Sequence, residues 1–299
     1  MKNANRIAIA FGLTIAAAGA LWMAHAQESS QAAPQAKGKK GGGGKQARVD
    51  MNTLVRPIDM HDTVWIEDMT QLEVRDSLKA GKTTALIFAG GMEDNGPYVT
   101  VSQHNSIVRA MCDSIARKLG AALCAPIVGM APGNPETSRN PGSIQLSAET
   151  YKGVLSDTAA SLKTEGFKNV MLMVDHGADQ NPTIEVSKAL TEEWKGSGAA
   201  IYYVPQYYDY NEVETFEHDV LHVREAREGY HDDYYTASIS VAIDPNGARM
   251  PERIKAGKTT INGVQLAGPK AVEDGKKIME FRTDAAVKAI QKLLAENKL

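Results

Sequence analysis

Short apolar segments that stop abruptly at glycine or polar residues constrain the fold of this chain more than any other feature. Four of them read as buried strands, at residues 84–91, 121–129, 169–174 and 199–207. The stretches between them place apolar residues at helical spacing, as in residues 103–119. Strands that alternate with helices of this length are joined by right-handed crossovers. We therefore expect an α/β fold of three layers, α/β/α, with a mostly parallel central sheet.

Further helices are predicted by their end signals. Ser147 is a suitable N-cap for a helix that Gly166 ends, and Pro182 is suited to the start of the next helix. Two more helices are expected at residues 234–243 and 270–294. In a sheet of this kind the ligand site lies beyond the carboxyl ends of the strands.

The N-terminal segment is typical of a secretory signal peptide. Lys2 and Arg6 precede the apolar run 7–23, and the small residues of Ala24-His25-Ala26 follow it. The alternative is an uncleaved membrane anchor, because about 20 apolar residues can span a bilayer. We expect cleavage after residue 26 and export to the periplasm or the medium, with no stable membrane insertion afterwards.

The expected domain organisation follows from this segment. Residues 1–26 are the signal peptide, and residues 27–48, rich in Gly, Lys and Gln, are predicted to be a flexible linker. Residues 49–299 then form the α/β domain. Lys and Arg together number 33 against 36 Asp and Glu. With no basic excess to neutralise phosphates, nucleic acid is not an expected partner.

Two cysteines lie in this exported chain. Cys112 falls on a predicted helix and Cys124 on the next predicted strand. An oxidising compartment permits a disulfide between them, and two buried free thiols are the alternative.

Polar side chains follow the first and third predicted strands. Glu93 and His104 come after the first strand, and His176 comes directly after the third. Two imidazole nitrogens and one carboxylate suit a divalent transition metal with a position left open for water. Each residue also has an ordinary structural alternative, as a solvated loop acid or a hydrogen-bonded histidine.

Five segments, in order and with compatible spacing, resemble motifs of the creatininase family. They are residues 91–104, residues 136–144 (Glu-Thr-Ser-Arg-Asn-Pro-Gly-Ser-Ile), residues 166–177, residues 228–238 and residues 263–275. This family comprises metal-dependent hydrolases that act mostly on amide-type C–N bonds. The resemblance spans about residues 62–297 and implies a creatininase-like fold.

The resemblance also implies a metal centre with departures from the family pattern. Glu93 and His176 match ligands of the first of two metals in the family. His104 stands where the family has an Asp that bridges both ions, Asn95 replaces a His, and Ala178 replaces a Glu. We therefore expect one divalent ion per chain, bound by Glu93, His104 and His176, with zinc as first choice and manganese or iron as alternatives.

Roles for other residues follow from the same resemblance. Asp94 or Asp179 would take a proton from the metal-bound water, and His231, which matches the family's catalytic histidine, would protonate the leaving nitrogen. Expected substrate contacts are Asn95, Tyr98, Glu136 and Tyr234. The tyrosines at residues 202–210 either line a pocket or pack against the core.

Two functions remain open from the sequence. The first is a metal-dependent hydrolase of a cyclic amide or related C–N bond in a small polar substrate. The second is a catalytically inactive exported binding or assembly protein that retains the fold. The resemblance further implies a homo-oligomer, often a hexamer.

Overall fold

The centre of the fold is a four-stranded parallel sheet, as expected. In the computed structural model, which describes residues 49–296, the strands have the order β2-β1-β3-β4. Their bounds are Thr84–Ala89 for β1, Ala122–Cys124 for β2, Asn169–Val174 for β3 and Ala200–Tyr203 for β4. The predicted signal peptide and linker lie outside the described residues.

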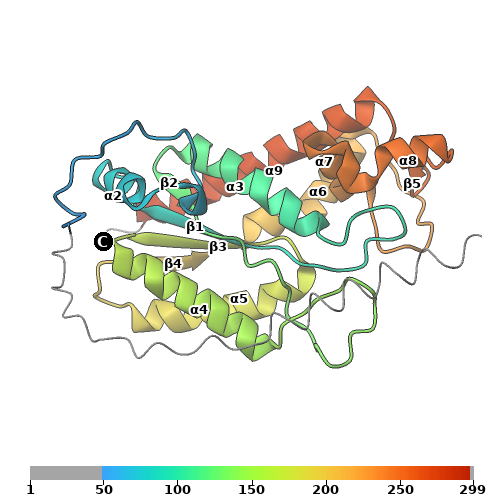
Figure 1. Cartoon of the computed structure of the whole chain (residues 1–299). Coiled ribbons are helices and arrows are strands. Elements are labelled where there is room, and N and C mark those ends of the chain that lie inside the picture. The colour runs from blue at the N-terminus through green and yellow to red at the C-terminus, as the bar shows by residue number, and fades with distance from the viewer. Residues whose placement is uncertain (1–48, 297–299) are drawn as a thin grey trace, which may run out of the picture. The chain divides into compact units, whose positions relative to one another are not determined.

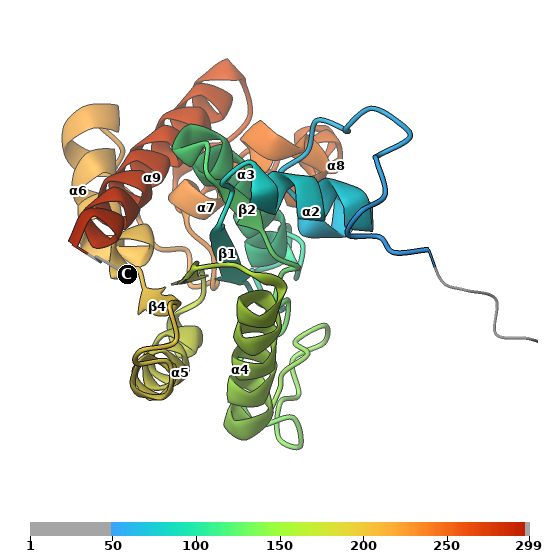
Figure 2. The same ribbon diagram turned by 90° about the vertical axis from the view of Figure 1, so that its left-hand side faces the viewer.

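Helices cover both faces of this sheet (Figures 1 and 2). One face carries α4 (Ala148–Glu165) and α5 (Gln180–Glu193), and the other carries α3 (Gln103–Leu119), α7 (Tyr234–Ile243) and α9 (Pro269–Glu296). The three-layer α/β/α prediction is confirmed.

Alternating side chains of the strands feed two hydrophobic cores. On β1, Leu86 and Phe88 point into the core under α3, α7 and α9, whereas Ile87 points into the core under α4 and α5. All residues of β1 are buried. This explains why β1 reads as a continuous apolar run rather than an alternating one.

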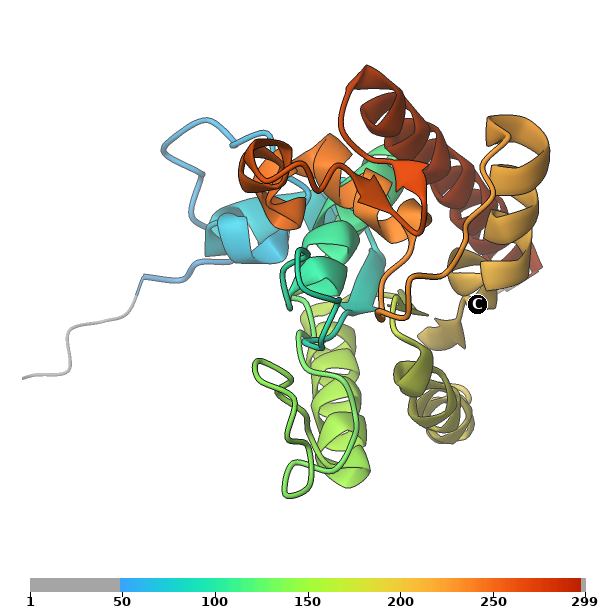
Figure 3. The same ribbon diagram turned by 90° about the vertical axis from the view of Figure 1, so that its right-hand side faces the viewer.

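Shorter elements complete the chain (Figure 3). They are α2 (Gln71–Lys79), α6 (Tyr210–Phe216), the π-helix η4 (Glu217–Leu221), α8 (Met250–Lys255), the hairpin strands β5 (Thr260–Ile261) and β6 (Val264–Gln265), and the 3₁₀ helices η1 (Ile66–Asp68), η2 (Gly177–Asp179), η3 (Pro205–Tyr208) and η5 (Pro245–Ala248). Within residues 49–296, no helix is long and apolar enough to cross a membrane.

Several boundaries differ from those predicted. The second and fourth strands end earlier than expected, close to Pro126 and Pro205, because proline donates no hydrogen bond to a strand ladder. Helix α5 begins at Gln180 rather than at Pro182, which lies in the first turn, where a helix needs no backbone donor. The predicted N-cap is confirmed, since Ser147 accepts a hydrogen bond from the Thr150 N–H.

The two cysteines form a disulfide between α3 and β2. Cys112 and Cys124 have their Cα atoms 6.1 Å apart, and both side chains are buried in the core under α3. Of the two alternatives left by the sequence, the structure has the disulfide.

Candidate functional site

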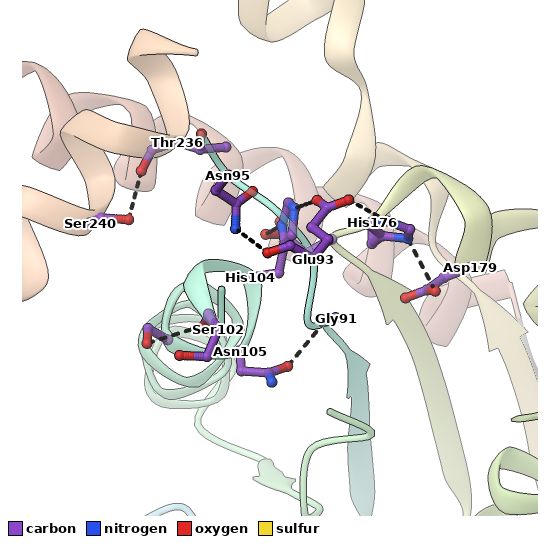
Figure 4. Close-up of polar contacts among 12 residues, drawn as sticks. Gly91, Glu93, Asn95, Ser102, His104, Asn105, His176, Asp179, Thr236 and Ser240 are labelled. Atoms are coloured by element: carbon purple, nitrogen blue, oxygen red, sulfur yellow. Dashed lines mark hydrogen bonds and ion pairs between the residues drawn. The ribbon is translucent and has the colours of Figure 1, made fainter. Parts of the chain in front are cut away.

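The sheet topology brings the polar segments after β1 and β3 together. The two strands are neighbours, and Ala89 at the end of β1 pairs with Val174 at the end of β3. Glu93 follows β1 by four residues and His176 follows β3 by two. The side chain of His104, in the first turn of α3, lies beside Glu93 and His176 (Figure 4).

One carboxylate joins the two histidines. Nε2 of His104 lies 2.7 Å from Oε1 of Glu93, and Nε2 of His176 lies 2.9 Å from Oε2 of the same side chain. The imidazole rings meet edge to face, with centroids 5.6 Å apart. The structure therefore gathers all three residues that the sequence predicted as metal ligands.

A second carboxylate lies behind each histidine. Nδ1 of His104 is 2.9 Å from Oδ2 of Asp175, and Nδ1 of His176 is 3.5 Å from Oδ1 of Asp179. Histidines that bind metals usually have a carboxylate or carbonyl at the outer nitrogen, which fixes the ring and its tautomer. His104 has this arrangement, whereas Asp179 lies farther from His176, whose Nδ1 makes no hydrogen bond to it.

Asp175 is anchored by a buried cation from α9. Its Oδ1 accepts hydrogen bonds from Arg282 and, at 3.0 Å, from the hydroxyl of Tyr207. The Arg282 guanidinium also lies over the Tyr207 ring, 4.3 Å from its centroid. Burial opposes ionisation of Asp175, yet Arg282 and His104 hold its pKa below the usual range.

The neighbouring carboxylates favour the charged form of both imidazoles. Burial lowers the pKa of His104, but hydrogen bonds to Asp175 and Glu93 overcome it and raise the pKa to about 10. The pKa of His176 rises to about 9 against burial, through Asp179 and Glu93. Binding of a metal would therefore release protons from these rings.

The donor set fits one divalent ion by chemistry. Two imidazoles and a carboxylate converge, and each imidazole has a supporting carboxylate. In the described part of the chain, however, no three His, Cys, Asp or Glu side chains are spaced around a common point so that they could hold an ion as they stand. Glu93, His104 and His176 contact one another directly, so an ion would have to separate them.

A second ion finds no comparable set of donors here. The amide nitrogen of Asn95 donates to the carbonyl oxygens of Glu93 (3.3 Å) and Thr100 (3.1 Å). Ala178, at the family's glutamate position, offers no side-chain donor. One ion is therefore the most that this donor set accommodates.

These residues open onto a cavity of about 470 Å³. Its wall contains Glu93, Asn95, His104, His176 and His231 from the predicted site, the acids Glu214, Glu217, Glu225, Asp232 and Asp233, and the tyrosines Tyr208, Tyr210, Tyr230 and Tyr235. For Tyr208 and Tyr210 the pocket interpretation of the aromatic segment is therefore confirmed, whereas Tyr207 is buried in the core.

His231 lies at the mouth of the cavity, beside Glu93. Its Nδ1 is 3.0 Å from the carbonyl oxygen of Asp94 and 3.6 Å from Oε2 of Glu93. Because a carbonyl oxygen only accepts, Nδ1 carries a proton. In the neutral ring Nε2 is then the atom that can accept one, as a general base or acid requires.

The two predicted proton acceptors do not line the cavity. The carboxylate of exposed Asp94 accepts a hydrogen bond from Asn140, so only its backbone carbonyl meets the site. Asp179 is fully buried behind His176. Burial raises the pKa of Asp179 to about 6, although His176 works against this shift.

Of the four expected substrate contacts, only Asn95 lines the cavity. Tyr98 lies under the guanidinium of Arg253, which is 4.7 Å from the ring centroid. Glu136 is in an exposed loop, and the Tyr234 hydroxyl donates to Asp274 within the core. Tyr235, the next residue of α7, faces the cavity instead, because a one-residue step turns the side chain by about 100° around a helix.

Three acids of the cavity wall, Glu214, Glu217 and Glu225, were missed by sequence reasoning. Glu217 lies on the π-helix η4, and Glu225 lies on a segment outside regular helix or strand. Neither has a spacing pattern that separates it from solvated surface acids.

Comparisons with known proteins agree with this arrangement. The family described as creatininase, creatinine amidohydrolase, matches residues 67–290. No curated protein sequence matches the chain.

Solved creatininase structures are similar in fold. A creatinine amidohydrolase (creatininase) has 17% identity and a TM-score of 0.59, with 78% of this chain and 98% of that chain covered. A manganese form has 18% identity and a TM-score of 0.58 over 77% and 98% of the two chains. A Zn-Zn form of a creatininase mutant has 18% identity and a TM-score of 0.58 over 78% and 98%. The family match covers most of the chain, and the chain therefore belongs to the creatininase family.

Proposed function

We propose that this protein is a metal-dependent hydrolase that cleaves a cyclic amide or related C–N bond in a small polar substrate. The observation that carries the proposal is the convergence of Glu93, His104 and His176 at a cavity of about 470 Å³. Membership of a family of creatinine amidohydrolases supports the reaction class.

The proposed ion is held by Glu93, His104 and His176, one per chain. Zinc is our first choice, and manganese or iron are alternatives. The manganese and zinc forms of similar structures support a divalent metal. When bound, such an ion lowers the pKa of a coordinated water and polarises a carbonyl group.

His231 is the proposed proton carrier. Its Nδ1–H is held by the Asp94 carbonyl, so Nε2 takes a proton and returns it to the leaving nitrogen. The side chain is 66% exposed, which leaves the ring free to exchange protons with solvent between turnovers. Asn95 is proposed to contact the substrate from the adjoining wall.

A second function is favoured by one observation. Asn95, Ala178 and Thr236 stand at positions where the family has a metal-binding or catalytic side chain. Such replacements suit an inactive protein that binds small molecules or takes part in assembly. The hydrolase and this alternative differ in whether the purified protein contains metal.

The decisive experiment measures metal content by elemental analysis of the mature protein, purified without added metal or chelator. We expect about one Zn, Mn or Fe per chain, and loss of the ion in a His104→Ala/His176→Ala variant. Exposed His61 provides the control, since His61→Ala removes an imidazole outside the cavity. Hydrolysis of a panel of cyclic amides should disappear with the ion. A wild-type protein that contains no metal refutes the hydrolase and supports the alternative.

Export and assembly are part of the proposal. We propose a periplasmic or secreted homo-oligomer, a hexamer by family resemblance. N-terminal sequencing of the mature protein and light scattering after gel filtration test these two points.

A further inference from the structure

One part of the cavity wall is lined with acids that the proposed hydrolysis does not use. It consists of Glu214, Glu217, Glu225 and Asp233, which we term the acidic wall. Glu214 lies near the C-terminus of α6, and Glu217 is the first residue of the π-helix η4. Glu225 and Asp233 lie between η4 and α7. A π-helical segment often occurs at a functional site, because it displaces side chains from regular helical positions.

Glu217 is a buried carboxylate without a partner. The residue is only 6% exposed, and its Oε1 has no hydrogen-bond partner. A buried ionisable group without partners is costly and rare in folded proteins. The side chain nevertheless lines the cavity, so a ligand in the cavity can reach it.

The neighbouring acids are held by the protein itself. Oε2 of Glu225 accepts from the Tyr234 N–H at 2.9 Å and from the Asn262 amide at 2.7 Å. Oδ1 of Asp233 caps α7 by accepting from the Thr236 N–H at 2.9 Å. These two carboxylates are thus fixed in place, and their charges act on the unpartnered Glu217.

Among residues 49–296, no ion pair joins a basic side chain to Glu217, Glu225 or Asp233, although Arg227 and His218 line the same cavity. Burial raises the pKa of Glu217 to about 8, and the charges of Glu225 and Asp233 add to the effect. A cation in the cavity would remove the repulsion that these acids exert on one another.

Aromatic rings beside the acids favour an organic cation. Tyr208, Tyr210 and Tyr235 line the same cavity, and the rings of Tyr210 and Tyr235 meet edge to face with centroids 5.8 Å apart. Aromatic faces attract ammonium groups that carry alkyl substituents, and together with carboxylates they form a common recognition site for them.

We propose that the acidic wall binds a primary ammonium group of the substrate, with Glu217 as its principal partner. The substrate is then a cationic amide: its ammonium group lies at Glu217, and the bond to be cleaved lies at Glu93 and His231. This inference rests on the proposed hydrolase function and names its substrate class.

The test compares two probes that differ only in the ammonium group. Binding of 5-aminopentanamide and of neutral pentanamide to the mature protein is measured by calorimetry at pH 7. We expect the ammonium probe to bind at least about tenfold more tightly, a difference of about 1.4 kcal/mol, because a hydrogen bond between charged groups is stronger than one between neutral groups. In Glu217→Gln, which keeps the shape but cannot ionise when an ammonium group binds, the two probes should bind about equally. The control Glu193→Gln changes an exposed acid outside the cavity and should keep the wild-type preference.

Several outcomes overturn the inference. Equal binding of the two probes by wild type refutes it, as does a preference that survives in Glu217→Gln. Calcium binding that depends on Glu217, without any ammonium preference, means a metal site instead. If Glu217→Gln does not fold, Glu225→Gln is used, and the same loss of preference is expected.

The metal content keeps this inference separate from the proposed hydrolase. An ammonium preference in a protein without metal means that the hydrolase proposal fails and the acidic wall stands as a binding site. Metal in the protein with no ammonium preference means that only this inference fails.

Discussion

The substitution Arg282→Met tests whether the buried ion pair behind the site holds the fold together. Arg282 is 2% exposed in its side chain and Asp175 is fully buried. Arg282 also donates to the backbone carbonyl oxygen of Tyr207. Methionine fills part of the same volume but removes the guanidinium that pairs with the Asp175 carboxylate.

The expected cost is large because the remaining charge stays buried. Removing one partner of a buried pair destabilises a protein by about 3–5 kcal/mol. His104 and the Tyr207 hydroxyl still bond Asp175, so we expect the lower half of this range, about 3–4 kcal/mol. The double variant Asp175→Asn/Arg282→Met should recover part of the loss, since it leaves no uncompensated charge.

Arg109→Met is a closely matched control. Arg109 also pairs with two acids and lies over a ring, that of Trp65, at 4.5 Å, but its side chain is 45% exposed. An exposed pair contributes only about 0–1 kcal/mol. Urea denaturation of the wild-type and variant mature proteins gives the free energies of unfolding. Equal losses in Arg282→Met and Arg109→Met would refute the argument that burial makes this ion pair essential.

Three further changes test the packing and local electrostatics. Gly275→Ala should destabilise the protein, because a Cβ there overlaps a backbone carbonyl of α7. Gly153 has open space around it, so Gly153→Ala should stabilise the protein by about 0.5–1 kcal/mol in the same urea assay. Replacing Cys112 and Cys124 by alanine should lower the free energy of unfolding by about 3 kcal/mol, and an unchanged urea midpoint contradicts this. Hydrogen bonds from backbone N–H groups lower the pKa of Glu73 from 4.5 to about 2. The ionised carboxylate of Glu73 therefore stabilises the fold above pH 4.5, and this contribution is lost as the pH falls towards 2. The difference in free energy of unfolding between wild type and Glu73→Gln should therefore shrink as the pH falls from 4.5 towards 2. A difference that stays constant over this range contradicts the lowered pKa of Glu73.

The layer architecture could be predicted because apolar periodicity and end signals agree along most of the chain. The bounds of α3 and α7 follow directly from their patterns, residues 103–119 and 234–243. Helix α6 and the π-helix η4 were not predicted. Their sequence, Tyr210–Leu221, contains four acids and few regularly spaced apolar residues, so its helical form depends on packing against the rest of the domain.

Two of the three candidate metal ligands could be placed together from the sequence because they follow strands, where topology decides position. Glu93 and His176 follow the paired strands β1 and β3, and His104 joins them from the first turn of α3. Tyr98 and Tyr234 could not be assigned in this way, since their contacts depend on side-chain direction. Each instead meets a partner distant in sequence, Arg253 for the first and Asp274 for the second.

The departures from the family pattern form one connected unit. In the motifs that the chain resembles, the family has Gly where this chain has Asp175, and Asp where it has His104. Both nitrogens of His104 face carboxylates, which only accept hydrogen bonds when ionised, so a Gly in place of Asp175 would leave the ring with one anionic partner fewer. A buried Asp175 in turn requires Arg282. His104 therefore did not simply replace a metal ligand: the side chains behind it supply the charges that its imidazole needs.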